Sequence, residues 1–280
     1  MTLPHQPPAS GRLKVAAIQM VSGISLDNNL SEALRLLRQA ASAGAELAVL
    51  PEYFCFMGAN DEDKLVLAET PGLGKVQDFL SDCARDLKLW IVGGTLPMAT
   101  DDPTHAANAS LAYNPRGECT SRYDKIHLFR YDNGRERYDE AAVLRAGETP
   151  TVFDCRDAGG HHWRVGQSVC YDLRFGELYR MLAADVLLVP SAFTHTTGQA
   201  HWEVLLRARA IENQAFVIAS AQGGVHENGR RTWGHTMVID PWGGVMAMQA
   251  EGPGVVMAEL DFEQLRSVRE QLPSLQHRRL

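Results

Sequence analysis

The feature that most constrains the fold of this chain is an alternation of short apolar runs with amphipathic segments in its first hundred residues. Residues 13–20, 47–50 and 90–96 are apolar runs of strand length. Between them, residues 27–44 and 75–87 place apolar side chains at helical spacing. Strands that alternate with helices pack as a sheet covered by helices. This part of the sequence therefore predicts an α/β fold.

The remainder of the chain is richer in strands. Residues 109–113 and 118–123 flank Asn114-Pro115-Arg116-Gly117, a turn signal that predicts a hairpin. Further strands are predicted at 163–169, 185–189, 216–221, 235–239, 245–248 and 255–260, and helices at 176–183, 201–213 and 261–271. Residues 131–144 are predicted to be a loop with a short helix. We expect one domain over residues 13–280, a sheet sandwich with helices outside, preceded by a flexible tail over residues 1–12.

Charge and hydropathy exclude several classes of protein. The formal net charge of -7 argues against a nucleic-acid partner, because phosphate binding needs a basic face. No apolar run approaches the roughly 20 residues that span a bilayer, so no membrane partner is expected. The first ten residues lack a stretch of signal-peptide type, which predicts a cytoplasmic protein.

The cysteines and histidines give no pattern of metal ligands. The five cysteines include no C-x-x-C pair, so most are expected to be buried, inert thiols. The histidines, including the pair His161-His162, lack partners at recognised ligand spacing. The sequence predicts no metal site and no cofactor.

Three reactive side chains come at or directly after predicted strand ends. Cys170 follows the strand-like residues 163–169, Glu52 closes the apolar run 47–51, and Lys125 follows residues 121–123. Amide hydrolysis needs a nucleophile, a base and donors for an oxyanion. Cys170 could attack, Glu52 could carry its proton to the leaving amine, and Lys125 with the backbone N–H of Tyr171 could hold the oxyanion. Taken singly, each residue also fits a structural role, as a core thiol, a capping carboxylate and a solvated lysine.

The motifs around these three residues resemble those of the nitrilase (carbon–nitrogen hydrolase) superfamily. The matching segments are Leu47-Ala48-Val49-Leu50-Pro51-Glu52, Tyr123-Asp124-Lys125-Ile126-His127-Leu128 and Val169-Cys170-Tyr171-Asp172-Leu173-Arg174-Phe175. The resemblance implies a Glu52, Lys125 and Cys170 triad and a four-layer αββα sandwich. It also implies protomers that pair across helices, so a homodimer or a larger even-numbered assembly is expected.

Later segments resemble one subgroup of that superfamily. Residues 190–193, 200–212, 234–243 and 276–279 are similar to deaminated glutathione amidases and their ω-amidase relatives. This resemblance implies a small amide substrate that bears a carboxylate. Deaminated glutathione would give 2-oxoglutarate and cysteinylglycine. The alternatives are 2-oxoglutaramate and other small amides or N-carbamoyl compounds.

The family also uses a second carboxylate, which orients the substrate and the base. By its distance before Gly147 this role falls on Glu140, with Glu136 as the rival.

Three further residues are expected near the substrate. Arg174 could clamp a substrate carboxylate or form a structural salt bridge, for example with Glu177. The resemblance places Phe193 and Thr197 in the pocket wall.

Two other hypotheses make different predictions. A papain-like peptidase would pair Cys170 with a histidine such as His235 and would tolerate loss of Lys125. A non-catalytic scaffold of the same fold would have no reason to keep the three triad residue types.

Overall fold

The computed structural model describes residues 11–279, and most of the predicted N-terminal tail, residues 1–10, lies outside this range. Arg12, the last residue assigned to that tail, begins the first strand. The first sheet has the order β18-β1-β2-β3-β5-β4, and β6 and β9 also pair with β5. Its strands are β1 (Arg12–Gln19), β2 (Leu47–Val49), β3 (Trp90–Val92), β4 (Leu96–Ala99), β5 (Ala106–Tyr113), β6 (Cys119–Asp124), β9 (Leu144–Arg145) and β18 (Gly254–Asp261).

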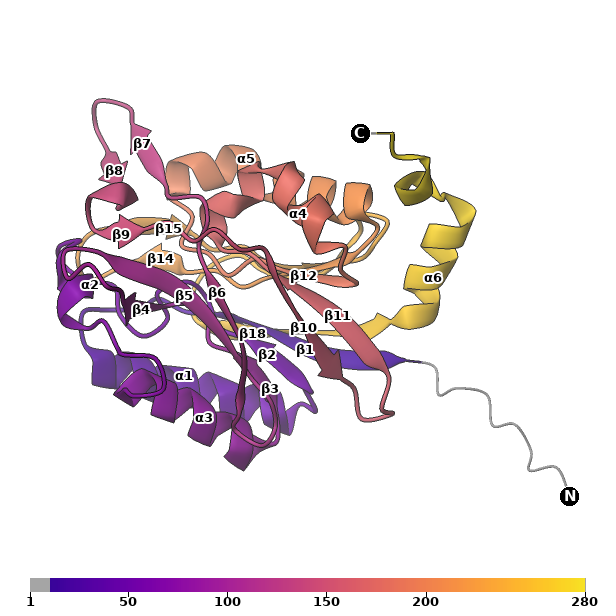
Figure 1. The fold of residues 1–280 in the computed structure, drawn as a ribbon, viewed down its shortest axis with the longest axis horizontal. Coiled ribbons are helices and arrows are strands. Elements are labelled where there is room, and N and C mark those ends of the chain that lie inside the picture. The colour runs from indigo at the N-terminus through magenta and orange to yellow at the C-terminus, as the bar shows by residue number, and fades with distance from the viewer. Residues whose placement is uncertain (1–10, 280) are drawn as a thin grey trace, which may run out of the picture.

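A second sheet with the order β10-β11-β12-β13-β16-β17 lies against the first (Figure 1). Its strands are β10 (Thr151–Arg156), β11 (His162–Gln167), β12 (Val186–Leu188), β13 (Phe216–Ala219), β16 (Thr236–Ile239) and β17 (Val245–Gln249). Two small hairpins, β7 (Arg130–Asp132) with β8 (Arg137–Asp139) and β14 (Gly223–Val225) with β15 (Arg231–Trp233), stand outside the two sheets.

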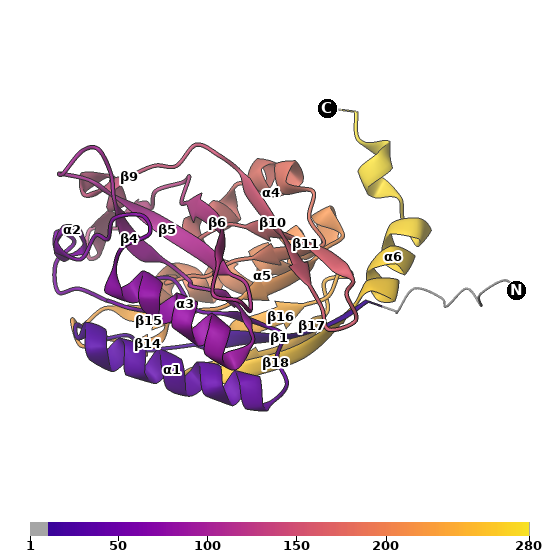
Figure 2. The ribbon, with the colours of Figure 1, turned by 60° about the horizontal axis from the view of Figure 1, so that its bottom comes forward.

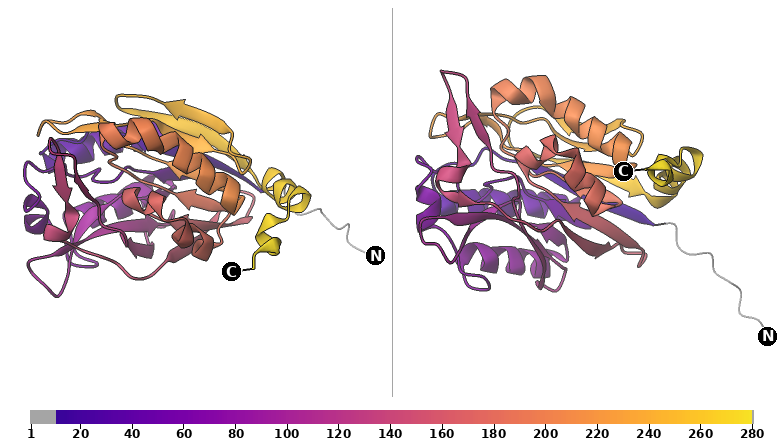
Figure 3. Two further views of the ribbon diagram at one scale, coloured as in Figure 1. Left: turned by 90° about the horizontal axis from the view of Figure 1, so that it is seen from above. Right: turned by 45° about the horizontal axis from the view of Figure 1, so that its top comes forward.

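Helices cover the outer face of each sheet (Figures 1 and 2). Helices α1 (Leu26–Ser42) and α3 (Lys75–Leu87) pack on the first sheet, and α4 (Gly176–Leu182) and α5 (His195–Asn213) pack on the second. The short α2 (Asp63–Val66) lies by β4, and α6 (Phe262–Gln271) extends from β18 to the side of the sandwich (Figure 3). Within residues 11–279 the chain also forms three 3-10 turns: η1 (Glu140–Ala142), η2 (Cys170–Arg174) and η3 (Ser274–His277).

The alternation of side chains along β1 shows how the layers form. Val15 and Ala17 are fully buried between the two sheets, whereas Ala16 and Ile18 are fully buried beneath the helices. The register of β1 is set by pairing with β18 along its whole length. A slip of one residue would exchange these two faces, so the register is strongly determined. The predicted four-layer αββα sandwich is confirmed.

Parallel pairing directs the functional segments to defined sheet edges. β1, β2 and β3 run parallel, and so do β11, β12 and β13. The carboxyl ends of parallel strands meet at one edge, where ligand sites of α/β sheets occur. Glu52 follows β2 and Cys170 follows β11, so both residues leave their sheets at such an edge.

The structure differs from the sequence prediction in several segments. Residues 90–96 form parts of two strands, because the chain turns at Gly94. The φ of Gly94 is 47°, and an added Cβ there would lie 1.9 Å from the carbonyl oxygen of Pro51. The predicted loop at residues 131–144 contains the β7–β8 hairpin as well as a 3-10 turn. Strand β10 and the β14–β15 hairpin were not predicted, and α5 begins at His195 rather than at residue 201. Of the helices within residues 11–279, none has the length and apolar character to cross a membrane.

Candidate active site

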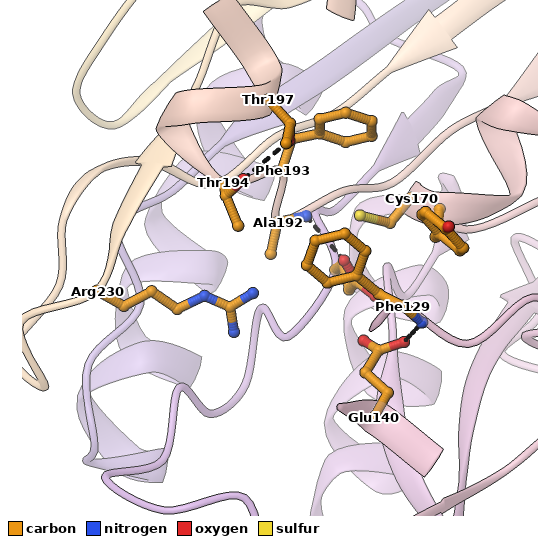
Figure 4. A pocket seen from close by; sticks show the side chains of 10 residues that line it. Phe129, Glu140, Cys170, Ala192, Phe193, Thr194, Thr197 and Arg230 are labelled. Carbon is orange, nitrogen blue, oxygen red and sulfur yellow. Dashed lines mark hydrogen bonds between the residues drawn. The ribbon is translucent and has the colours of Figure 1, made fainter. Parts of the chain in front are cut away.

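A pocket holds most of the residues that the sequence singled out (Figure 4). Its lining combines two carboxylates, one thiol, one guanidinium and an aromatic wall. The lining residues are Glu52, Phe129, Glu140, Cys170, Tyr171, Ala192, Phe193, Thr194, Thr197 and Arg230. They come from segments that lie far apart in the sequence and that meet only in the folded chain.

Glu52 is held rigidly in this pocket. Its side chain is 1% exposed. Its Oε1 accepts hydrogen bonds of 3.0 Å from both Asn108 Nδ2 and Lys125 Nζ, and its Oε2 accepts one of 2.8 Å from the backbone N–H of Ala192. A buried carboxylate is tolerated only with partners of this kind. These contacts fix Glu52 in one orientation beside the pocket.

Lys125 joins the two carboxylates. It is 1% exposed, and its Nζ donates to Glu140 Oε2 at 2.8 Å and Oε1 at 3.0 Å as well as to Glu52. Burial disfavours the charged lysine, but the carboxylates of Glu140 and Glu52 outweigh this effect and raise its pKa. Lys125 is therefore a permanent cation at neutral pH. An ammonium held in this way can stabilise an oxyanion without reorganising.

Glu140 is the second carboxylate of this group. Besides Lys125 it accepts hydrogen bonds from Tyr53 Oη at 2.9 Å and from the backbone N–H of Phe129 at 2.7 Å. Burial acts to raise the pKa of Glu140, yet the charge and hydrogen bonds of Lys125 lower it overall. Glu136, the alternative from the sequence, lies elsewhere and accepts a hydrogen bond of 3.1 Å from Thr196 Oγ1.

Cys170 begins the 3-10 turn η2, separated from the end of β11 by two residues. Its φ is 50°, a left-handed conformation that non-glycine residues adopt at a cost of order 1 kcal/mol and that often marks functional sites. Burial and the negative charge of Glu52 raise the pKa of the thiol well above its usual value, and Lys125 opposes this change. The resting thiol is therefore protonated at neutral pH. It needs a base at the moment when it reacts.

A buried acid two residues later fixes the turn that carries this thiol. Asp172 accepts hydrogen bonds from the backbone N–H of Val169 at 2.8 Å, from Tyr123 Oη at 2.7 Å and from the N–H of His127 at 3.0 Å. Its Oδ1 also lies 2.7 Å from His127 Nδ1. The same carboxylate thus ties η2 to the segment that bears Lys125, and it sets the thiol and the ammonium relative to each other.

The other predicted residues are placed as follows. Tyr171, Phe193 and Thr197 line the pocket, and Thr197 Oγ1 lies 2.8 Å from Thr194 Oγ1. Arg174 is not among the lining residues. Its guanidinium lies over the rings of Tyr171 and Phe193, and both terminal nitrogens are 3.4 Å from Nδ1 of a histidine on α5.

Sequence reasoning did not single out Arg230. This residue precedes β15, in a hairpin that the sequence did not predict, and its guanidinium lies over the ring of Tyr138 at 4.9 Å. No periodic pattern marks its position. The only available signal was a positive charge in a polar turn, which is ordinarily exposed to solvent.

The carbon–nitrogen hydrolase family profile matches residues 14–270. The chain belongs to this family. It is 43% identical over 274 residues to a deaminated glutathione amidase from Synechocystis, an alignment that covers 94% of this chain and 97% of the relative.

Solved structures agree with this assignment. Nit3 of Saccharomyces cerevisiae, a member of branch 10 of the nitrilase superfamily, superposes with a TM-score of 0.84 at 30% identity, covering 96% of this chain and 97% of Nit3. An amidase from Nesterenkonia superposes with a TM-score of 0.76 at 25% identity over 94% of this chain and 98% of the amidase. That structure shows Michael addition of acrylamide at the active-site cysteine of the amidase.

Proposed function

We propose that this carbon–nitrogen hydrolase is an amidase that cleaves deaminated glutathione to 2-oxoglutarate and cysteinylglycine through a thioester on Cys170. The observation that carries the proposal is the grouping of Cys170, Glu52 and Glu140 in the wall of one pocket, with Lys125 bonded to both carboxylates. The substrate follows from the curated name of the Synechocystis relative. The cysteine adduct in the Nesterenkonia amidase supports the nucleophile.

The proposed reaction begins at the protonated thiol. Glu52 takes the proton of Cys170 while the sulfur attacks the amide carbonyl carbon. The carbonyl oxygen becomes an oxyanion, held by Lys125 Nζ and the backbone N–H of Tyr171. When the tetrahedral intermediate collapses, the C–N bond breaks and the departing amine takes the proton from Glu52. The acyl group remains on sulfur as a thioester.

Hydrolysis of the thioester uses the same groups in reverse. Glu52 removes a proton from water, the resulting hydroxide attacks the thioester carbonyl, and the C–S bond breaks. The thiolate recovers a proton and the free acid leaves. Glu140 touches no reacting atom in this scheme and instead holds Lys125 in place. Phe193 and Thr197 form part of the wall against the acyl chain.

A Cys170→Ala variant tests the chemistry. We expect it to fold and to lose all hydrolysis of deaminated glutathione, whereas the unchanged protein should show an acyl adduct on Cys170 by mass spectrometry of a quenched reaction. An active Cys170→Ala protein would refute the mechanism.

A competition assay of deaminated glutathione against 2-oxoglutaramate, expressed as a ratio of kcat/KM values, decides between the amidase and ω-amidase alternatives.

The peptidase hypothesis finds little support in the geometry. The ring of His235 stacks on Trp233 at 4.1 Å, and its Nδ1 lies 2.9 Å from the carbonyl oxygen of Trp233. His235 does not line the pocket that contains Cys170. The scaffold hypothesis would gain support if no amide in a broad panel were hydrolysed.

We further propose that residues 13–280 act as one domain and that two copies pair through α4 and α5. Exposed apolar side chains on these helices support the pairing, namely Met181, Val204 and Ile211, which are 66%, 69% and 50% exposed. Light scattering should give twice the chain mass of 30.9 kDa or an even multiple of it.

We also propose a cytoplasmic location. All five cysteines of the described residues are free thiols, which fits the reducing environment of the cytoplasm.

A further inference from the structure

A second cavity lies directly beside the pocket that contains Cys170. Its lining comes from three segments, namely residues 53–64 after Glu52, residues 137–143 at the end of the β7–β8 hairpin, and residues 228–230 in the turn of the β14–β15 hairpin. Arg230 lines both cavities, so its side chain forms the boundary between them. Figure 4 shows this boundary on the opposite side of the pocket from Cys170.

The walls of the two cavities are bonded to each other. Tyr53 lines the second cavity and donates a hydrogen bond of 2.9 Å to Glu140, which lines the pocket with the thiol. Tyr138 also lines the second cavity, and the guanidinium of Arg230 lies over its ring at 4.9 Å. A ligand that extends from Cys170 past Arg230 therefore enters the second cavity.

The two cavities differ in size. The pocket with Cys170 encloses about 270 Å³, which is below the roughly 300–1,000 Å³ of sites for drug-sized ligands. The second cavity, together with its open mouth, encloses about 1100 Å³. The acyl half of an amide must occupy the first pocket, because the thioester forms on Cys170. The amine half of a larger amide then needs a separate site, which the second cavity offers.

The charged side chains around the second cavity leave an excess of positive charge. Asp61 and Glu62 are its acidic residues, and Lys64, Arg137 and Arg230 are its basic residues. Lys64 Nζ lies 2.5 Å from Asp61 Oδ1, and this ion pair cancels one charge of each sign. Arg137 and Arg230 form no ion pair within 4.0 Å among residues 11–279. Two guanidinium groups against one further carboxylate favour a bound anion.

Arg137 is placed to meet the part of a ligand that lies far from the thiol. Arg230 stands at the boundary of the first pocket, whereas Arg137 lines the second cavity and not the first. Arg137 begins β8 and is exposed, so its side chain can adjust to a ligand. A guanidinium binds a carboxylate through two parallel N–H···O bonds.

We propose that the second cavity binds the amine half of the substrate and that Arg137 pairs with a carboxylate of that half. This proposal rests on the proposed amidase function. It selects amides whose departing amine is an amino acid or short peptide with a free carboxylate. Cysteinylglycine carries such a carboxylate at the end remote from the bond that is cleaved. Arg137 touches no reacting atom and acts on specificity alone.

The test compares three substrates that share one acyl half and are all followed by release of 2-oxoglutarate. Deaminated glutathione carries the carboxylate on its amine half, its C-terminal carboxamide lacks that charge, and 2-oxoglutaramate releases only ammonia. Loss of a solvent-exposed charge pair weakens binding about fivefold. We therefore expect Arg137→Gln to lower kcat/KM about fivefold for deaminated glutathione and to leave the other two values unchanged. Arg137→Lys should keep part of the preference, and added salt should reduce it in the unchanged protein.

Arg135 supplies the matched control. It lies in the turn of the same hairpin, it is exposed, and it is not among the residues that line the second cavity. Arg135→Gln makes the same change of charge and should leave all three values near those of the unchanged protein.

Three results would overturn the proposal. If Arg137→Gln lowers the values for deaminated glutathione and its carboxamide equally, Arg137 does not recognise the carboxylate. If the value for 2-oxoglutaramate falls by the same factor, the substitution has disturbed the first pocket. If no value changes, the amine half binds elsewhere. Failure of the proposed function gives a different result, because the unchanged protein would then hydrolyse neither deaminated glutathione nor 2-oxoglutaramate above the Cys170→Ala background.

Discussion

The buried ammonium of Lys125 offers the sharpest test of how this site is held together. Lys125→Met keeps the length and much of the volume of the side chain but removes its charge. The substitution leaves Glu52 and Glu140 in the interior without the three Nζ hydrogen bonds of 2.8–3.0 Å that now bind them. Removing one partner of a buried ion pair costs about 3–5 kcal/mol of unfolding free energy. We expect a loss in this range at pH 8.

The same variant should show a pH dependence with a defined sign. In the unchanged protein, the lowered pKa of Glu140 stabilises the folded state above about pH 4.3, and this stabilisation is lost as the pH falls through the pKa of Glu140 in the folded state. The raised pKa of Lys125 also stabilises the folded state, and this contribution is fully present below about pH 10.4. Both contributions are constant from pH 5 to pH 8. Without Lys125, burial of Glu140 raises the pKa of its carboxyl group instead. Protonation of Glu140 at low pH should then remove the cost of the buried charge, so the loss of unfolding free energy at pH 5 should be at least about 1 kcal/mol smaller than at pH 8.

Chemical denaturation at the two pH values, at equal protein concentration, provides the assay. Lys14→Met removes an exposed lysine from β1 and should change stability by less than about 0.5 kcal/mol. The double variant Lys125→Met/Glu140→Gln should lose less than the sum of the single variants, because the two groups interact. A loss below about 1 kcal/mol for Lys125→Met at pH 8, or an equal loss at both pH values, would refute this reasoning.

Two further predictions concern the turns that carry Cys170 and Glu52. Asp172→Asn places an amide among backbone and side-chain hydrogen-bond donors that now bind a carboxylate. We therefore expect at least about 2 kcal/mol of destabilisation in chemical denaturation and a lower kcat in steady-state kinetics. Unchanged stability would mean that these hydrogen bonds contribute little. Gly94→Ala should lower the unfolding free energy by more than about 2 kcal/mol, because its Cβ would collide with the carbonyl of Pro51. Gly229→Ala, at a φ of 82° with open space around it, should lower it by only about 1 kcal/mol. Similar denaturation midpoints for the two variants would contradict this prediction.

Local patterns predicted much of the sandwich correctly. Residues 75–87 were predicted as a helix and form α3, and the Asn114-Pro115-Arg116-Gly117 turn joins β5 to β6. These segments were predicted correctly because the conformation of an amphipathic helix or of a turn depends mainly on a few neighbouring residues in the sequence. β10 and the β14–β15 hairpin were missed, since short strands in polar surroundings carry little periodicity.

The sequence by itself determined the layered α/β architecture and the reactive residue types at strand ends, because hydrophobic periods of 2 and 3.6 residues are local properties. Only the tertiary structure decided which side chains meet. It brought Glu140 rather than Glu136 to Lys125, and it put Arg230 rather than Arg174 in the pocket wall. Glu140 directly follows the β7–β8 hairpin, and Arg230 lies in the turn of the β14–β15 hairpin. The positions of both hairpins depend on contacts with distant segments. Long-range packing of this kind leaves no periodic signal in the sequence.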